Sequence, residues 1–287
     1  FKAIKLLSEV GLPLLAVLCV IAVWKTSSMI PFSDIWNAGP VSTPITIPMG
    51  VAAVVGSFAV GVTMVGDFSR FSKSKRDCII GVSIGHCWGY IPILMCGAFF
   101  NYAFHNWNIV EIMILSLGLG LFGALVLIIG QWTTNDNNLY TSVLGLMNTL
   151  DGISKVPRMR LTLIVGLIST AIAAVGLYKY FVTFLSLLGV FITPIGGILI
   201  ADFYICNRKN YDGGDVPQGI KWDAIVSWAV ASFVGVTMTA RPVGLGWFVA
   251  VGDVIPVPLI CIAVAMVLYV VSQKLQNRKL QNKAGAV

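Results

Sequence analysis

Charged side chains are scarce in this sequence. Of the 287 residues, 11% are charged and 57% are hydrophobic, and the mean hydropathy is +0.88. A water-soluble domain ordinarily has about 25% charged and about 45 to 50% apolar residues. This apolar excess excludes a soluble enzyme, a nucleic-acid-binding protein and a disordered chain.

Motifs of metal and disulfide chemistry are lacking as well. The sequence has two histidines and no His-Glu-x-x-His pattern, and its six cysteines include no Cys-x-x-Cys pair. The spacing of the cysteines therefore supports neither a zinc site nor a disulfide framework. We expect no enzymatic activity.

What the sequence does contain is a series of long apolar runs. Only helices and closed barrels satisfy every backbone polar group in a bilayer, and barrel strands would alternate apolar and polar residues. The continuous runs therefore predict an all-α polytopic membrane protein with a single transmembrane domain over residues 1–287. About 20 helical residues cross a bilayer, and eight segments approach this length: 6–24, 50–66, 78–104, 119–148, 161–178, 181–204, 224–239 and 246–272.

Basic residues predict the orientation of these helices. Sixteen of the nineteen Lys and Arg residues lie on one side of the eight crossings, and only Lys25, Lys179 and Arg241 lie on the other. The positive-inside rule makes the basic side cytoplasmic, together with both ends of the chain. We expect a multi-pass protein of the cell inner membrane whose partner is the lipid bilayer, with no nucleic acid despite the net charge of +7.

Acidic residues near the predicted helix ends carry less information. We interpret Asp202, close to Arg208 in the sequence, as an interfacial anchor, and Glu9 and Asp253 give no specific signal. The first residue is Phe1 and not Met, so we expect the chain to begin inside a longer protein.

The fourth segment contains the densest group of polar residues, GQWTTNDNNLY at 130–140. Polar groups at bilayer depth are costly unless they are paired or line a wet cavity. The hydroxyls of Thr133 and Thr134, with a carbonyl exposed by a loosened turn at Gly130, would suit a small cation. Asn135 offers both a donor and an acceptor to an amide-like heterocycle. The alternative is a water-filled kink or a hydrogen-bonded patch between helices.

Two other segments contain helix-weakening residues. In the second, Gly56 and Gly61 flank Ser57 and Phe58, a hydroxyl and a ring able to stack on a planar ligand. Such glycines alone are typical of close helix packing, but beside the polar run they indicate a transporter site. In the sixth segment, the Pro194 region predicts a kink.

Three strings carry a family resemblance: GQWTTNDNNLYTS at 130–142, VGSFAVGVTMVGDFSRF at 55–71 and PIGGILIADFYICNRKNY at 194–211. In order and spacing the chain resembles the cytosine permease branch of the nucleobase:cation symporter-1 family over nearly its whole length. The resemblance implies a leucine-transporter-type inverted-repeat fold of two five-helix repeats and two further helices. The eight predicted helices then correspond to family helices five to twelve, and the first four are absent.

The resemblance also implies roles for particular residues. Sodium would be bound by the backbone carbonyl of Gly130 and the side chains of Thr133 and Thr134. The nucleobase would contact Ser57, Phe58 and Asn135, with Phe58 stacked on one face of the base. Further contacts would come from family helices one and three.

The chain departs from the family pattern at two positions. Val60 stands where cytosine permeases have a second serine, and Gly130 replaces an asparagine. The change at Val60 leaves the choice of base open, whereas only a main-chain oxygen is needed at Gly130.

The expected function is import of cytosine by sodium symport with alternating access. We expect a monomer with sodium as coupling ion and no other cofactor. One alternative keeps the fold and changes the cargo to another purine or pyrimidine, allantoin, a hydantoin or a thiamin-precursor pyrimidine, with sodium or protons as coupling ion. The other alternative is a truncated, non-transporting membrane protein.

Overall fold

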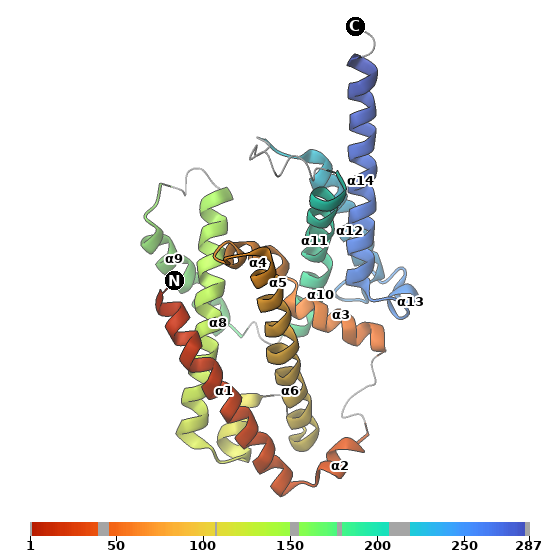
Figure 1. Ribbon diagram of the computed structural model, residues 1–287. Coiled ribbons are helices and arrows are strands. Elements are labelled where there is room, and N and C mark those ends of the chain that lie inside the picture. The colour runs from red at the N-terminus through yellow and green to blue at the C-terminus, as the bar shows by residue number, and fades with distance from the viewer. Residues whose placement is uncertain are drawn as a thin grey trace. The chain divides into compact units, whose positions relative to one another are not determined.

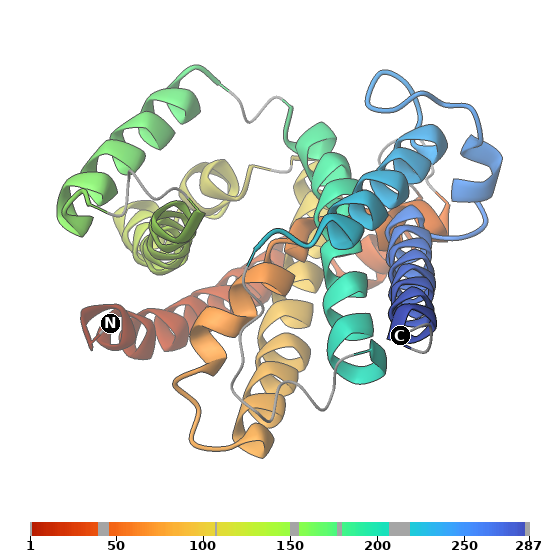
Figure 2. The same cartoon turned by 90° about the horizontal axis from the view of Figure 1, so that it is seen from above.

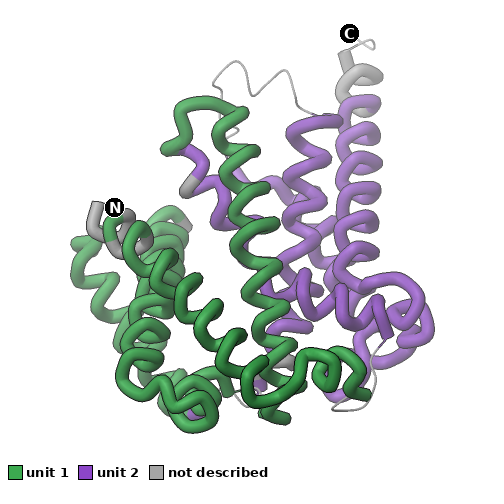
Figure 3. Tube along the Cα trace, turned by 60° about the horizontal axis from the view of Figure 1, so that its bottom comes forward, with its two compact units in different colours: residues 1–44, 71–175 green, residues 45–70, 176–287 purple. Residues whose placement is uncertain are grey.

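The computed structural model describes residues 2–39, 46–106, 108–149, 155–176, 180–206 and 219–284, and all regular structure in these ranges is helical. The chain divides into two compact units (Figure 3). Unit 1 comprises residues 1–44 and 71–175, and unit 2 comprises residues 45–70 and 176–287. Within the expected single domain, each unit thus has a hydrophobic core of its own.

Unit 1 is built on two long helices that lie side by side, α1 (Lys2–Met29) and α8 (Gly120–Thr149) (Figure 1). The other helices of unit 1 are α2 (Phe32–Trp36), α5 (Lys75–Ile84), η1 (Gly85–Tyr90), α6 (Ile91–Phe104), α7 (Ile109–Glu111), η2 (Ile112–Ser116) and α9 (Arg158–Ala174). Leu18 of α1, Phe100 of α6 and Val126 of α8 meet in the core, each no more than 3% exposed. The short helical segment α7–η2 closes this core with Ile112 and Met113.

Unit 2 is organised around α14 (Val257–Ala284), which packs against α11 (Thr193–Ala201) and α12 (Trp222–Met238); the α14 helix is the dark blue one seen end-on in Figure 2. Ile198 and Ala201 of α11 form a core there with Ala231, Ala265 and Tyr269. The other helices of unit 2 are α3 (Ile47–Phe58), α4 (Gly61–Ser69), α10 (Phe181–Phe191), η4 (Asp202–Cys206) and α13 (Val249–Gly252).

Glycines let helix backbones of unit 2 approach closely. A Cβ atom at Gly56 of α3 would overlap the carbonyl oxygen of Leu185 in α10, and one at Gly197 of α11 would overlap that of Ile262 in α14. Small residues permit such contacts in membrane helices, where van der Waals packing replaces the hydrophobic effect.

The two interruptions expected from glycine and proline are present. The helix predicted over 50–66 is split into α3 and α4, and the one predicted over 181–204 is interrupted at Ile192, just before Pro194. Proline has no N–H to donate and disrupts the helix. At the same break, Ile195 donates to Ile192 and not to Phe191, and the carbonyl of Phe191 accepts a hydrogen bond of 2.7 Å from the indole nitrogen of Trp228 in α12.

The last helix begins later than expected. The predicted range was 246–272, but α13 ends at Gly252 and α14 starts at Val257. Pro256 and Pro258 flank this start. A proline disfavours helical geometry in the residue before it and suits the first helical turn, so the prolines place the boundary here.

Among the described residues, five helices are long and apolar enough to cross a membrane: Glu9–Met29, Ile47–Asp67, Lys75–Phe104, Thr183–Cys206 and Val257–Arg278. The apolar α12 has 17 residues, as has α9, and the polar run lowers the hydropathy of α8. Large apolar side chains are widely exposed, among them Val20 (69%), Leu167 (70%) and Val267 (60%). Such surfaces are typical of contact with lipid. The protein is an all-helical polytopic membrane protein.

Candidate functional site

The polar run lies in the middle of α8, which is a continuous helix of 30 residues. The loosened turn expected at Gly130 is therefore wrong. Instead, the hydroxyl of Thr133 donates a hydrogen bond of 2.8 Å to the Gly130 carbonyl oxygen. In a continuous helix the Gly130 carbonyl also accepts from the backbone N–H of Thr134, so the Thr133 hydroxyl oxygen is the one that keeps lone pairs for a cation.

The residues of the run divide between two faces of α8. Thr133 is 7% exposed, and its methyl group packs toward α1, 3.6 Å from the position of a Cβ on Gly11. Thr134 and Asn135 are exposed, as is Trp132 at 57%. Within unit 1, the Thr133 side faces protein and the Thr134–Asn135 side is open.

The C-terminal part of the run bonds to its own helix. Thr141 donates to the carbonyl oxygens of Asn137 and Asn138 at 3.0 and 3.1 Å, and Ser142 donates to that of Asn138 at 2.7 Å. The guanidinium of Arg158 lies 4.5 Å from the centre of the Tyr140 ring, a cation–π contact between α9 and α8. These contacts account for the side chains of Tyr140, Thr141 and Ser142, and the exposed residues Thr134 and Asn135 are the candidates for a ligand that the sequence selected.

Ser57 and Phe58 end helix α3 in unit 2, next to the interruption before α4. The Ser57 hydroxyl donates 2.7 Å to the carbonyl of Val54, and the Phe58 side chain is 44% exposed. The Phe58 ring lies over Gly61, where a Cβ atom would overlap the ring. Gly61 therefore leaves room for the Phe58 ring, which the sequence analysis predicts to stack on the ligand.

The predicted site residues thus form two groups. Gly130, Thr133, Thr134 and Asn135 share one helix of unit 1, and Ser57 and Phe58 share one helix end of unit 2. That the two groups bind one ligand together stays a prediction. In the described part of the chain no three His, Cys, Asp or Glu side chains gather as a metal site. The cation ligands that the sequence analysis selected are all neutral oxygens.

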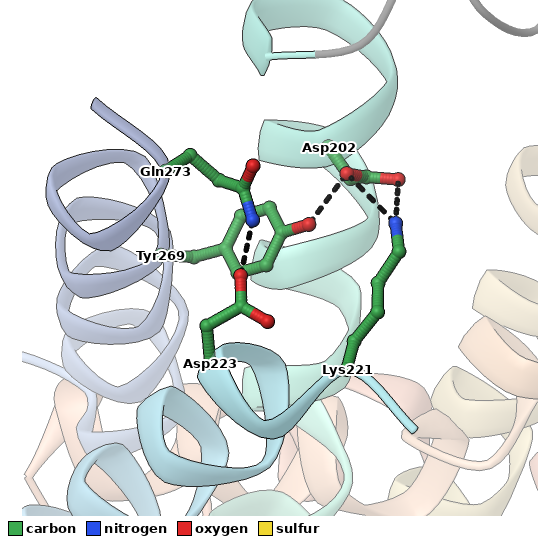
Figure 4. Close-up of polar contacts among 5 residues, drawn as sticks. All are labelled: Asp202, Lys221, Asp223, Tyr269 and Gln273. Carbon is green, nitrogen blue, oxygen red and sulfur yellow. Dashed lines mark hydrogen bonds and ion pairs between the residues drawn. The ribbon is translucent and has the colours of Figure 1, made fainter. Parts of the chain in front are cut away.

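Unit 2 contains a polar cluster that the sequence did not predict (Figure 4). Asp202 of η4 is 5% exposed. The hydroxyl of Tyr269 in α14 donates a hydrogen bond of 2.5 Å to Oδ1 of Asp202. The Nζ atom of Lys221 lies 3.4 Å from both carboxylate oxygens. Beside it, the Gln273 amide donates to Asp223. Asp202 is thus a link between helices and not a simple interfacial anchor, and Arg208 lies outside the described residues. The sequence signal for this cluster was an acidic residue, Asp202, at the end of an apolar run.

One string has the letters of a hydrolase motif. Residues 81–85 read Gly-Val-Ser-Ile-Gly. A hydrolase nucleophile of this pattern occupies a sharp turn between a strand and a helix. Ser83 lies inside helix α5, so the geometry of that motif is absent at this serine.

Comparison with known proteins agrees with a transport role. Residues 1–263 match the family model described as "Permease for cytosine/purines, uracil, thiamine, allantoin". Cytosine permeases of Escherichia coli strains K12, O6:H1 and O157:H7 are each 32% identical to the chain over 236 residues, which is 82% of this chain and 55% of theirs.

The chain spans about half the length of the curated relatives it matches. The family match itself covers nearly all of the chain, so the assignment does not depend on one segment. The relatives are permeases, which move their substrates and do not convert them. The chain belongs to the family of permeases for cytosine and purines, uracil, thiamine and allantoin.

Proposed function

We propose that the protein is a secondary active transporter that imports cytosine across the inner membrane by sodium symport. The observation that carries this proposal is an open Asn135 amide directly after two threonine hydroxyls, inside a helix whose first half is apolar. Intramembrane polar groups of this kind mark substrate and ion pathways. Family membership and the similarity to cytosine permeases of Escherichia coli support the cargo.

Two side chains would recognise the base. The Asn135 amide carries both a donor and an acceptor, which complement the polar edge of cytosine. The partly exposed ring of Phe58 offers a flat apolar surface for one face of the base. Ser57 would add a hydroxyl to this contact.

Neutral oxygens of α8 would bind the sodium ion. The Thr133 hydroxyl is already oriented by its hydrogen bond to the Gly130 carbonyl, and the Thr134 hydroxyl follows on the same helix. Because Thr134 and Asn135 are adjacent, ion and base would bind next to each other. Each ligand then raises the affinity for the other by the same factor, and the sodium gradient drives uptake.

Alternating access needs helices that can bend. The breaks between α3 and α4 and between α10 and α11 are the two hinges available in unit 2. Rocking of one group of helices against the other, as in leucine-transporter-type carriers, would expose the site to each side in turn. The protein would act as a monomer with both ends of this chain in the cytoplasm.

A second cargo is favoured by one observation. Val60 lies in the interruption between α3 and α4 and is 37% exposed, where a serine would offer a hydroxyl to the base. Its apolar side chain suits a substrate with fewer polar groups on that edge. Another nucleobase, allantoin, a hydantoin or a thiamin-precursor pyrimidine is therefore the competing proposal, with sodium or protons as coupling ion.

Uptake of radiolabelled cytosine tests the proposal. Cells expressing the natural gene product that contains this chain are assayed with and without a sodium gradient, in the presence of unlabelled uracil, adenine, hypoxanthine or allantoin. We expect sodium-dependent uptake that only cytosine-like bases inhibit. Well-expressed protein without cytosine uptake would reject cytosine and move the assay to the other compounds as labelled substrates.

A further inference from the structure

Unit 2 contains a cavity apart from the residues assigned above. Its volume is about 310 Å³, and it is lined by α3, α10, the connection from α12 to α14 and the first turn of α14. It lies where α12 ends at Met238. The Asp202 cluster lies instead at the start of α12 (Figure 4). Most of its wall is apolar, including Met49, Ala53 and Val190.

Two opposite charges line this apolar cavity, Arg241 and Asp253. The Oδ1 atom of Asp253 is shielded from solvent and has no hydrogen-bond partner among the described residues. Arg241 uses its Nε to donate 3.1 Å to the carbonyl of Leu245. In the described part of the chain no ion pair joins Asp253 to Arg241.

These side chains impose opposite requirements on a ligand. A carboxylate only accepts hydrogen bonds, and a guanidinium only donates them. A shielded carboxylate oxygen without a donor costs free energy, which a ligand N–H recovers once the partly exposed Asp253 carboxylate turns toward the cavity. The ligand must therefore present an N–H group and an acceptor on one polar edge, with an otherwise flat or apolar body.

We propose that this cavity is a second binding site for a nucleobase with an exocyclic amino group. The amino N–H donates to Asp253, the ring carbonyl accepts from Arg241, and the ring faces lie against the apolar wall. The volume falls at the small end of ligand pockets, roughly 300 to 1,000 Å³, and suits a single ring. This site rests on the proposed nucleobase transport but shares no residue with the site at Asn135.

The chemistry of Asp253 gives the site a selectivity. Cytosine offers an amino group where uracil has a carbonyl oxygen, and that oxygen would face the carboxylate with no proton between them. Sites built to hydrogen-bond a substrate group reject analogues that lack it. Asp253→Asn supplies an amide that can donate to uracil, so the variant should lose its preference for cytosine.

Equilibrium binding of labelled cytosine to the purified natural gene product in sodium buffer tests the second site. We expect two equivalents for the unmodified protein and one for Asn135→Ala. In the Asn135→Ala background, Asp253→Asn should weaken the remaining cytosine binding by about tenfold or more and narrow the difference from uracil. Ala53→Leu, which fills the cavity without touching either charge, should also remove this equivalent.

Asp34→Asn is the matched control, because Asp34 is an exposed carboxylate on α2 in unit 1. It should leave both equivalents intact. One equivalent that Asn135→Ala abolishes, and that Asp253→Asn and Ala53→Leu leave unchanged, overturns the second site while keeping the proposed function. No binding at all to folded protein rejects both.

Discussion

At the scale of single residues, Thr134 and Asn135 are neighbours on α8 that suit different ligands. A hydroxyl oxygen is a ligand for a hard cation, whereas an amide matches the donor and acceptor edge of a base. We therefore predict that Asn135→Ala abolishes cytosine binding at the α8 site and that Thr134→Ala mainly weakens the sodium dependence of this binding. Binding titrations of cytosine at several sodium concentrations separate these effects.

Thr170→Ala is the control for Thr134→Ala. The Thr170 hydroxyl on α9 donates 2.8 Å to the Gly166 carbonyl of its own helix, so its removal should change neither titration. Equal loss of base affinity and sodium dependence in both site variants would contradict separate roles.

The position of the Phe58 ring can be tested through its neighbour Gly61. A Cβ atom there would overlap the ring and push it out of place, since side-chain atoms move more easily than backbone atoms. We predict that Gly61→Ala lowers cytosine affinity roughly tenfold, in the range of one aromatic contact. Gly66→Ala in the same helix, where nothing lies within 4 Å of the new Cβ, should bind normally. Equal affinity in the two variants would remove Phe58 from the site.

Sequence reasoning selected these residues as candidates from local patterns, and their roles in binding stay predictions. The contacts that side chains make in the fold were less predictable. A loosened turn was expected at Gly130, but the Thr133 hydroxyl bonds to the Gly130 carbonyl within the helix. Residue types alone do not show whether a hydroxyl will bond to its own helix. Asp202 meets Lys221 and Tyr269 across 19 and 67 residues, a separation that no periodic pattern reports.

At the scale of helices, the contact between α3 and α10 depends on one glycine. A Cβ atom at Gly56 would overlap the backbone oxygen of Leu185, which cannot rotate away. Gly56→Ala should therefore destabilise the protein by roughly 1 to 3 kcal/mol through overpacking. Thermal unfolding in detergent measures this, with Gly97→Ala as control because its Cβ would meet open space. Equal melting temperatures would show that the helices are not in close contact.

Hydrogen bonds of the Asp202 cluster connect η4, the start of α12 and α14. Tyr269→Phe removes the donor at 2.5 Å from the buried carboxylate, which keeps its ion pair with Lys221. Loss of one partner of a buried charged group costs roughly 1 to 3 kcal/mol. We predict a lower unfolding temperature for Tyr269→Phe and no change for Tyr204→Phe, whose side chain on η4 is 65% exposed. A stable Tyr269→Phe protein would mean that the hydroxyl bond contributes little.

Helix positions were largely predictable because apolar runs, glycine and proline act locally. The breaks after Phe58 and before Pro194 follow from residue type alone. The start of α14 was not predicted. The largely apolar sequence continues from 246 through Pro256 and Pro258, so hydrophobic periodicity indicated no helix boundary there.

At the scale of the whole molecule, composition was the strongest predictor. An 11% charged content and long apolar runs required a helical membrane protein, and the helical structure and family match agree. The division into two units was not predictable, because it depends on which helices pack together and not on any local pattern. Asn135 lies in unit 1 and Phe58 in unit 2, and their binding of one base together stays a prediction.

The most direct test is a binding measurement on the purified natural gene product. Cytosine affinity is measured with and without sodium, and sodium affinity with and without cytosine. The account predicts that each ligand tightens the other by the same factor, because linkage is reciprocal. Cytosine binding of equal strength in sodium and choline buffers would contradict a sodium-coupled site.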